Sequence, residues 1–175
     1  MKRFLLILLV LMLLISSSIA DETFIDLNTF NILFNYAAAL TGSGNGIRED
    51  NISASLGVVN DIYQINLAEN VGLQISTPHI ENYQGELSDI NGILLMYVPD
   101  GKHNNSVKFI YAIGEIAIAT GAINSSSEIM DFLNEIGFSA DSSKSEAEGK
   151  KMINGLSYSY TISPYIGYLF TVSKP

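Results

Sequence analysis

Alternation of apolar and polar residues is the feature that most limits what this chain can fold into. Two runs in the first half of the chain have a period of two, one over residues 62–67 and the next over residues 71–76. This period is typical of strands that bury one face. The residues between the runs, Ala68-Glu69-Asn70, fit a short hairpin loop. The pattern therefore predicts two neighbouring antiparallel strands.

Three further strands are indicated later in the chain. Residues 93–98 (ILLMYV) are apolar without a break, which is typical of a central strand covered on both faces. Residues 155–163 alternate between apolar side chains and serine or threonine, Pro164 interrupts the run, and residues 165–172 continue as another strand. The sequence thus predicts about five strands.

Helical spacing appears on both sides of the central strand. Apolar residues between Phe30 and Ala37 fall on one helical face, and Asn28 is the expected N-cap. Residues 107–123 favour a mostly buried helix, although their β-branched content leaves a strand as the alternative. The glycine-rich residues 41–46 (TGSGNG) follow a helix and precede no Lys-Ser or Lys-Thr pair, so they indicate a flexible connection and not a phosphate loop.

Two capping-box spacings follow. Ser125 and Glu128 predict the start of an amphipathic helix that ends at Gly137. Ser143 and Glu146 repeat the spacing, which predicts a polar surface helix that runs to Asn154.

This order of elements predicts an α+β fold in a single domain. We expect a mainly antiparallel sheet of about five strands, with room for one parallel pairing, and helices mostly on one face. The order resembles small extracytoplasmic sensor domains of the PAS or profilin-like kind. That resemblance implies an apolar ligand pocket between the sheet and the helices.

The first twenty residues have the pattern of a secretory signal peptide. A positively charged head precedes an unbroken apolar run of twelve residues, 4–15, and Ser18-Ile19-Ala20 places small residues at the cleavage-site positions. A helix needs about 20 apolar residues to span a bilayer, so this run is too short.

We therefore expect cleavage between Ala20 and Asp21, with residues 21–175 secreted or held outside the cytoplasm. The alternative is a membrane anchor formed by residues 4–20, which is the one route to a membrane that we expect for this chain.

Composition narrows the partners. The chain of 175 residues has a net charge of −9, and an acidic surface repels nucleic acid and anionic membranes. It contains no cysteine, which excludes disulfides, cysteine nucleophiles and thiolate metal sites. Three sequons, at Asn51, Asn104 and Asn124, permit N-glycosylation of an exported chain.

Catalytic chemistry has few candidates, because the chain has only two histidines, His79 and His103. His79 lies in residues 76–89 (STPHIENYQGELSD), the best local cluster of titratable residues, but the spacing fits no metal-ligand pattern. No G-x-S-x-G motif marks a nucleophilic serine. The sequence therefore indicates no catalytic residue, no metal site and no cofactor.

Four tyrosines close together near the C-terminus are the remaining candidates: Tyr158, Tyr160, Tyr165 and Tyr168. Aromatic rows on a sheet bind sugars or anchor protein partners. The alternative is that Tyr158 and Tyr160 lie under the helices as core residues, which the alternation favours.

These observations predict a secreted or cell-envelope binding or structural module without enzymatic activity, whose partner is an envelope protein or a glycan. One alternative is a small extracytoplasmic hydrolase that uses His79 or His103 with nearby carboxylates. The other alternative is a small-molecule sensor domain.

Overall fold

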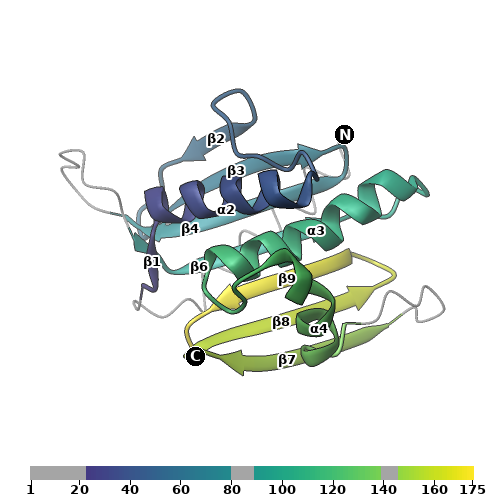
Figure 1. The fold of residues 1–175 in the computed structure, drawn as a ribbon. Helices are drawn as coiled ribbons and strands as arrows, with labels where there is room; N and C mark the ends of the chain where they lie inside the picture. The colour runs from purple at the N-terminus through teal and green to yellow at the C-terminus, as the bar shows by residue number, and fades with distance from the viewer. Residues whose placement is uncertain (1–22, 80–88, 139–145) are drawn as a thin grey trace.

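The structure is a computed structural model that describes residues 23–79, 89–138 and 146–175. It shows three α-helices packed in front of one antiparallel sheet (Figure 1). The helices are α2 (Leu27–Thr41), α3 (His103–Ala119) and α4 (Ile129–Glu135), the last preceded by a 3₁₀ turn, η1 (Ser126–Glu128). The proposed cleavage site at Ala20 and Asp21 lies outside the described residues, and so do residues 80–88 of the cluster around His79.

Seven strands form the main sheet, in the spatial order β2-β3-β4-β6-β9-β8-β7. Their bounds are β2 (Ile52–Ser55), β3 (Asn60–Ala68), β4 (Val71–Pro78), β6 (Gly92–Tyr97), β7 (Ala147–Ile153), β8 (Leu156–Ser163) and β9 (Gly167–Ser173). A two-stranded sheet joins β1 (Ile25–Asp26) to β5 (Asp89–Ile90). Every pairing in the described residues is antiparallel.

The α+β class is confirmed, and so is the central strand, since β6 is the fourth of the seven and all six of its residues are buried. The predicted number of five strands was too small. The two that the sequence did not reveal, β2 and β7, are the edges of the sheet. Edge strands have one paired side only and bury little, so their alternation is weak.

The polar helix expected up to Asn154 was wrong, because residues 147–153 form β7. Gly149 shows why a strand fits there. A Cβ atom at this position would lie 2.3 Å from the Ile136 carbonyl oxygen and 2.3 Å from the Tyr160 ring. The absence of a side chain at Gly149 lets β7 lie against both, and it pairs with β8 along its full length.

The helix expected within residues 107–123 is confirmed as α3, which begins earlier, at His103. The cap of α2 differs from the prediction: Asp26, not Asn28, is the N-cap, and its Oδ1 accepts a hydrogen bond of 2.8 Å from the Thr29 backbone N–H. At η1 the Ser125 hydroxyl donates to Glu128 Oε1 over 2.7 Å, so the two side chains of the expected capping box bond to each other.

One hydrophobic core lies between the sheet and the helices. The inward row of the central strands is Leu73, Ile75, Ile93, Leu95, Phe170 and Val172. Gly114 of α3 lets α4 come close, since a Cβ there would lie 2.5 Å from the Ile129 side chain. The described helices pack on this face (Figure 1). The alternate side chains of the sheet lie on the opposite face, where the described residues place no helix, and we call it the helix-free face.

Candidate functional site

The helix-free face carries side chains that the pairing register places in straight rows across the strands of the sheet. One row crosses the middle of the sheet and consists of Ser53, Gln64, Gln74, Leu94, Thr171, Ser159 and Lys150. A second row, nearer the hairpin between β3 and β4, consists of Asn66, Gly72, Met96, Leu169, Thr161 and Glu148. Directly opposed side chains in such rows contact one another.

Charge is confined to one edge of this face. Among its strand residues, only Glu148 and Lys150 of β7 are charged, although the chain has 27 charged residues. The remaining side chains are hydroxyls, carboxamides and aliphatic groups. A central surface of this kind suits a partner that is itself uncharged.

The β2–β6 half of the helix-free face is hollowed. The hollow has a volume of about 620 Å³ and is lined by strand residues Ser53, Gln64, Asn66, Gly72, Gln74, Leu94 and Met96. Loop residues Asp50, Asn51, Glu69 and Asn70 form its rim. This volume is in the range of small-molecule sites, about 300–1,000 Å³.

The side-chain carboxamides of three residues in the hollow have no hydrogen-bond partner among the described residues. These residues are Gln64, Gln74 and Asn66. Gln74 is the most constrained, because only 5% of it is exposed and its Oε1 is fully buried. A buried acceptor without a donor costs about 1–3 kcal/mol. The unpaired Gln74 Oε1 therefore marks a position where a ligand donor would be stabilised.

The floor of the hollow is apolar. Leu94 lies directly across from Gln74 in the register, and Met96 lies across from Gly72. Both aliphatic side chains are buried. The site thus combines an apolar floor with hydrogen-bonding groups beside it, which is the usual composition of ligand sites.

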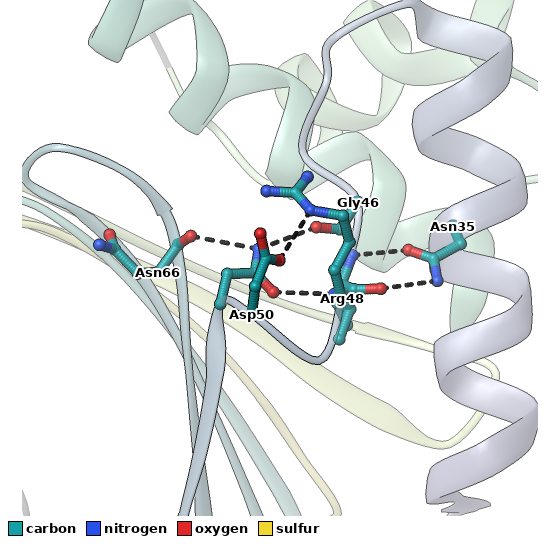
Figure 2. A network of polar contacts seen from close by, with 7 residues as sticks. Asn35, Gly46, Arg48, Asp50 and Asn66 are labelled. Carbon is teal, nitrogen blue, oxygen red and sulfur yellow. Dashed lines mark hydrogen bonds and ion pairs between the residues drawn. The ribbon is translucent and has the colours of Figure 1, made fainter.

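One rim of the hollow is held by the turn of residues 46–51 (Figure 2). Asn51 Nδ2 donates to the carbonyl oxygens of Gly46, at 3.0 Å, and Asn66, at 3.3 Å. Its Oδ1 accepts a hydrogen bond of 2.8 Å from the Arg48 backbone N–H. The Asn51 side chain therefore ties the turn to β3.

The same turn is tied to α2 by a second carboxamide. Asn35 Oδ1 accepts from the Ile47 N–H at 2.6 Å, and Asn35 Nδ2 donates to the Ile47 carbonyl at 3.1 Å (Figure 2). Arg48 pairs with Asp50 at 3.0 Å on the outside of the turn. The rim is thus fixed between the helix and the sheet before any ligand binds.

The hairpin between β3 and β4 forms a neighbouring part of the rim, at the same end of the sheet as the turn of residues 46–51. Glu69 pairs with Lys102, and Asn70 Nδ2 donates to Asp100 Oδ2 at 3.1 Å. Asp100 also accepts hydrogen bonds from the Lys102 backbone N–H, at 2.9 Å, and from Asn105 Nδ2, at 2.7 Å. These donors, the Lys102 N–H foremost, hold the pKa of the Asp100 carboxyl below its ordinary value.

The two histidines lie apart from the hollow and apart from each other. His79 follows the end of β4 that pairs with the start of β6, whereas His103 begins α3 beyond the other end of β6. His79 Nδ1 lies 2.8 Å from Asp61 Oδ1, and Asp61 also accepts a hydrogen bond from the Gly57 N–H. Within the described residues, no hydroxyl group is hydrogen-bonded to His79.

The four tyrosines occupy different environments. Tyr158 and Tyr160 are core residues, with their hydroxyls donating to Thr120 Oγ1 at 2.9 Å and to the Gly137 carbonyl at 2.7 Å. Tyr168 is half-buried beside Tyr97. Tyr165 is 85% exposed, so it alone of the four offers most of its ring to solvent.

The three sequons also differ. Asn104, in the first turn of α3, and Asn124, before η1, are exposed. Asn51 is half-buried, and both ends of its carboxamide are engaged in the rim of the hollow.

The hollow was not predicted from the sequence. The sequence feature that could have indicated it is the set of polar residues Gln64, Asn66 and Gln74 within the alternating runs, together with the aliphatic residues of the ILLMYV strand. What the sequence could not give was the pairing register that brings them together.

No family model matches the chain, and neither a curated protein nor a solved structure matches it significantly. In the part of the chain that the structure describes, no three His, Cys, Asp or Glu side chains are grouped so that they could hold a metal ion. Among those same residues, no helix has the length and apolar character needed to cross a membrane.

Proposed function

We propose that the protein is an exported binding module without enzymatic activity and that the hollow on its helix-free face is the ligand site. The observation that carries this proposal is the set of three carboxamides beside an apolar floor, Gln64, Gln74 and Asn66, which have no hydrogen-bond partner among the described residues. Of the three, Gln74 is buried, and its Oε1 atom is costly to leave without a donor. A donor on a ligand would offset that cost.

The rim supports the same proposal. Asn35 and Asn51 fix the turn of residues 46–51 through hydrogen bonds to main-chain atoms (Figure 2). A site that is already ordered loses less conformational entropy when it binds. The rigid rim therefore favours a binding role for the hollow.

Export is supported by the sequence of residues 1–20, and it places the partner outside the cytoplasm, as an envelope protein or a glycan. The N-terminal sequence of the protein from its host tests this part. A mature N-terminus at Asp21 supports export by cleavage, and an intact Met1 in the membrane fraction supports the anchor.

A ligand screen by thermal unfolding tests the binding role. The screen covers neutral and charged saccharides, peptides and amines, and it compares the wild type with Asn66→Trp. Asn66 is an exposed strand residue that lines the hollow, and we expect the larger indole ring there to fill the hollow. A ligand of the native state raises the melting temperature by mass action. We expect at least one ligand class to stabilise the wild type and not the variant. Equal shifts in both proteins, or none in either, would contradict the proposal.

A small hydrolase is the second candidate, favoured by the His79–Asp61 pair. A histidine oriented by a carboxylate is two thirds of a nucleophilic triad, but the third group is missing from the described residues. Replacing both histidines, as His79→Gln with His103→Gln, separates the two candidates. Ligand binding that survives in this double variant supports the binding module, whereas a hydrolytic activity that disappears in it supports the hydrolase.

A further inference from the structure

We propose that the hollow binds a short stretch of a neutral glycan, an uncharged ligand rich in hydroxyl groups, through the carboxamides of Gln64, Gln74 and Asn66. This inference rests on the proposed function, since it names the ligand class for the same hollow.

The buried Gln74 side chain needs a hydrogen-bond donor from the ligand. Gln74 Oε1 is buried without a partner at a position that lines the hollow. An acceptor in this state selects a ligand that brings an N–H or an O–H group to it. Ligands that carry only acceptors, such as fully deprotonated acids, leave Gln74 Oε1 as it is.

The carboxamides of the hollow match the hydroxyl groups of a sugar in hydrogen-bonding capacity. Each carboxamide offers a carbonyl acceptor and two N–H donors, and each hydroxyl both donates and accepts. Gln64 and Gln74 are direct cross-strand neighbours, and Asn66 is in the adjacent row. Side chains in this arrangement lie close enough to contact neighbouring groups of one ligand. Successive hydroxyls on a sugar ring present alternating donors and acceptors of this kind.

The residues around the hollow disfavour a charged ligand. Among the described residues that line the hollow there is no lysine, arginine or histidine, so an anionic ligand finds no counter-ion there. The two rim carboxylates, Asp50 and Glu69, already have cationic partners, Arg48 and Lys102. A cationic ligand would have to compete with those partners. An uncharged ligand has no such cost.

The apolar floor of the hollow suits the carbon-bound face of a sugar ring. Leu94 and Met96 are buried beside the carboxamides, since Leu94 pairs with Gln74 and Met96 pairs with Gly72, which has no side chain. The carbon-bound hydrogens of a sugar ring form an apolar face that such a floor can contact. A volume of about 620 Å³ accommodates more than one ring.

A peptide fits this site less well. Extended peptides are usually bound by main-chain hydrogen bonds at a free sheet edge. The strands beneath the centre of the hollow, β3, β4 and β6, are paired on both sides. Recognition in the hollow therefore depends on side chains, which favours the glycan.

Isothermal titration calorimetry with defined tetrasaccharides tests the inference. The neutral probes are the tetramers of β-1,4-linked glucose, α-1,4-linked glucose and β-1,4-linked N-acetylglucosamine. The charged probes are the tetramers of galacturonic acid and of glucosamine. The proteins are the wild type, Gln74→Leu, Gln64→Ala and, as a matched control, Thr161→Ala, which changes an exposed residue of the same face outside the hollow.

We expect at least one neutral tetrasaccharide to bind the wild type and Thr161→Ala with equal affinity. In Gln74→Leu, which keeps a side chain of similar size but removes the carboxamide, the affinity for this tetrasaccharide falls by about tenfold or more. If Gln74→Leu does not fold, Gln64→Ala tests the loss of a carboxamide at a half-buried position, and we expect the same fall in affinity. The charged tetramers bind at least tenfold more weakly than the neutral one.

Two results would overturn the inference, and they separate it from the proposed function. If no neutral tetrasaccharide binds, but a peptide or a charged ligand binds and Asn66→Trp blocks it, the glycan is wrong and the binding module stands. If nothing that binds is blocked by Asn66→Trp, both proposals fall.

Discussion

Glu115 of α3 and Asn45 of the loop after α2 lie 70 positions apart in the sequence, and Asn45 Nδ2 donates a hydrogen bond of 2.8 Å to Glu115 Oε2. Both residues are fully buried. The hydroxyls of Thr41 and Ser43 donate to the other carboxyl oxygen, at 2.7 and 2.6 Å. The Glu115 carboxyl group therefore anchors the segment that leads from α2 to the rim of the hollow.

We expect Glu115→Gln to lower the free energy of unfolding by about 1–3 kcal/mol, because an amide N–H₂ group would replace an oxygen that accepts a hydrogen bond in a buried site. Glu115→Ala removes the shared acceptor of Asn45, Thr41 and Ser43 and should cost more. Urea unfolding followed by circular dichroism measures both changes. Glu148→Gln, at an exposed position of β7, is the control and should stay within about 0.5 kcal/mol of the wild type. Equal stability of Glu115→Ala and the wild type would contradict the anchoring role.

The depressed pKa of Asp100 predicts a loss of stability in acid. A carboxyl whose pKa is lowered by folding stabilises the protein above its unfolded value, about 3.9, and this stabilisation is lost as the pH falls through the lower folded value. Asp100→Asn removes the titrating group and keeps an acceptor for the Lys102 N–H. The urea midpoint of the variant should be below that of the wild type at pH 7 and nearer to it at pH 3. An unchanged gap at the two pH values would show that Asp100 does not contribute.

Tyr158 predicts the response to alkali. Burial raises the pKa of its hydroxyl, against the smaller opposing effect of the hydrogen bond to Thr120. A raised folded pKa gives stabilisation that is fully present below the unfolded value, about 10, and is lost as the pH rises through the folded value. Tyr158→Phe should therefore lose about 0.5–1.5 kcal/mol at pH 7 and lose less than the wild type between pH 7 and pH 11. Tyr165→Phe, at an exposed ring, is the control. Identical alkaline unfolding of all three proteins would contradict the burial argument.

The rim of the hollow predicts which sequons are used in a secretory host that glycosylates. A glycan on Asn51 would replace one of the Nδ2 hydrogens that bond to Gly46 and Asn66, so it opposes the fold of the turn. Asn104 and Asn124 are exposed and have no such role. We expect folded protein to carry glycan at Asn104, Asn124 or both and none at Asn51. Peptide mass spectrometry after deglycosylation in heavy-oxygen water measures each position. A folded fraction glycosylated at Asn51 would contradict the prediction.

The sequence predicted the parts of the fold in which burial leaves a clear period. The two alternating runs form β3 and β4, and the continuous ILLMYV run forms β6, because both faces of a central strand are covered. The prediction of a helix in the region of β7 was wrong. Ser143, Glu146 and Lys150 have helical spacing, whereas the position of β7 depends on close packing at Gly149. Helical spacing of polar residues is a weak local signal, and a tertiary contact outweighed it.

The candidate site was less predictable than the fold. The TGSGNG segment has the composition of a flexible connection, yet it is fixed by Glu115, a residue that nothing in the local sequence links to it. The hollow likewise joins side chains from four strands, and a shift of the register by one residue would place different side chains on that face. Such sites depend on contacts between distant segments, which a single sequence does not reveal.

The most direct test of the central claim is a ¹H–¹⁵N correlation spectrum of the side-chain amides during titration with a neutral tetrasaccharide that binds. We predict that the NH₂ signals of Gln64, Gln74 and Asn66 shift together, while the signal of Asn124, which is exposed and does not line the hollow, stays unchanged. Shifts confined to residues around His79 and Asp61, or around Tyr165, with the Gln74 signal unchanged, would contradict this prediction.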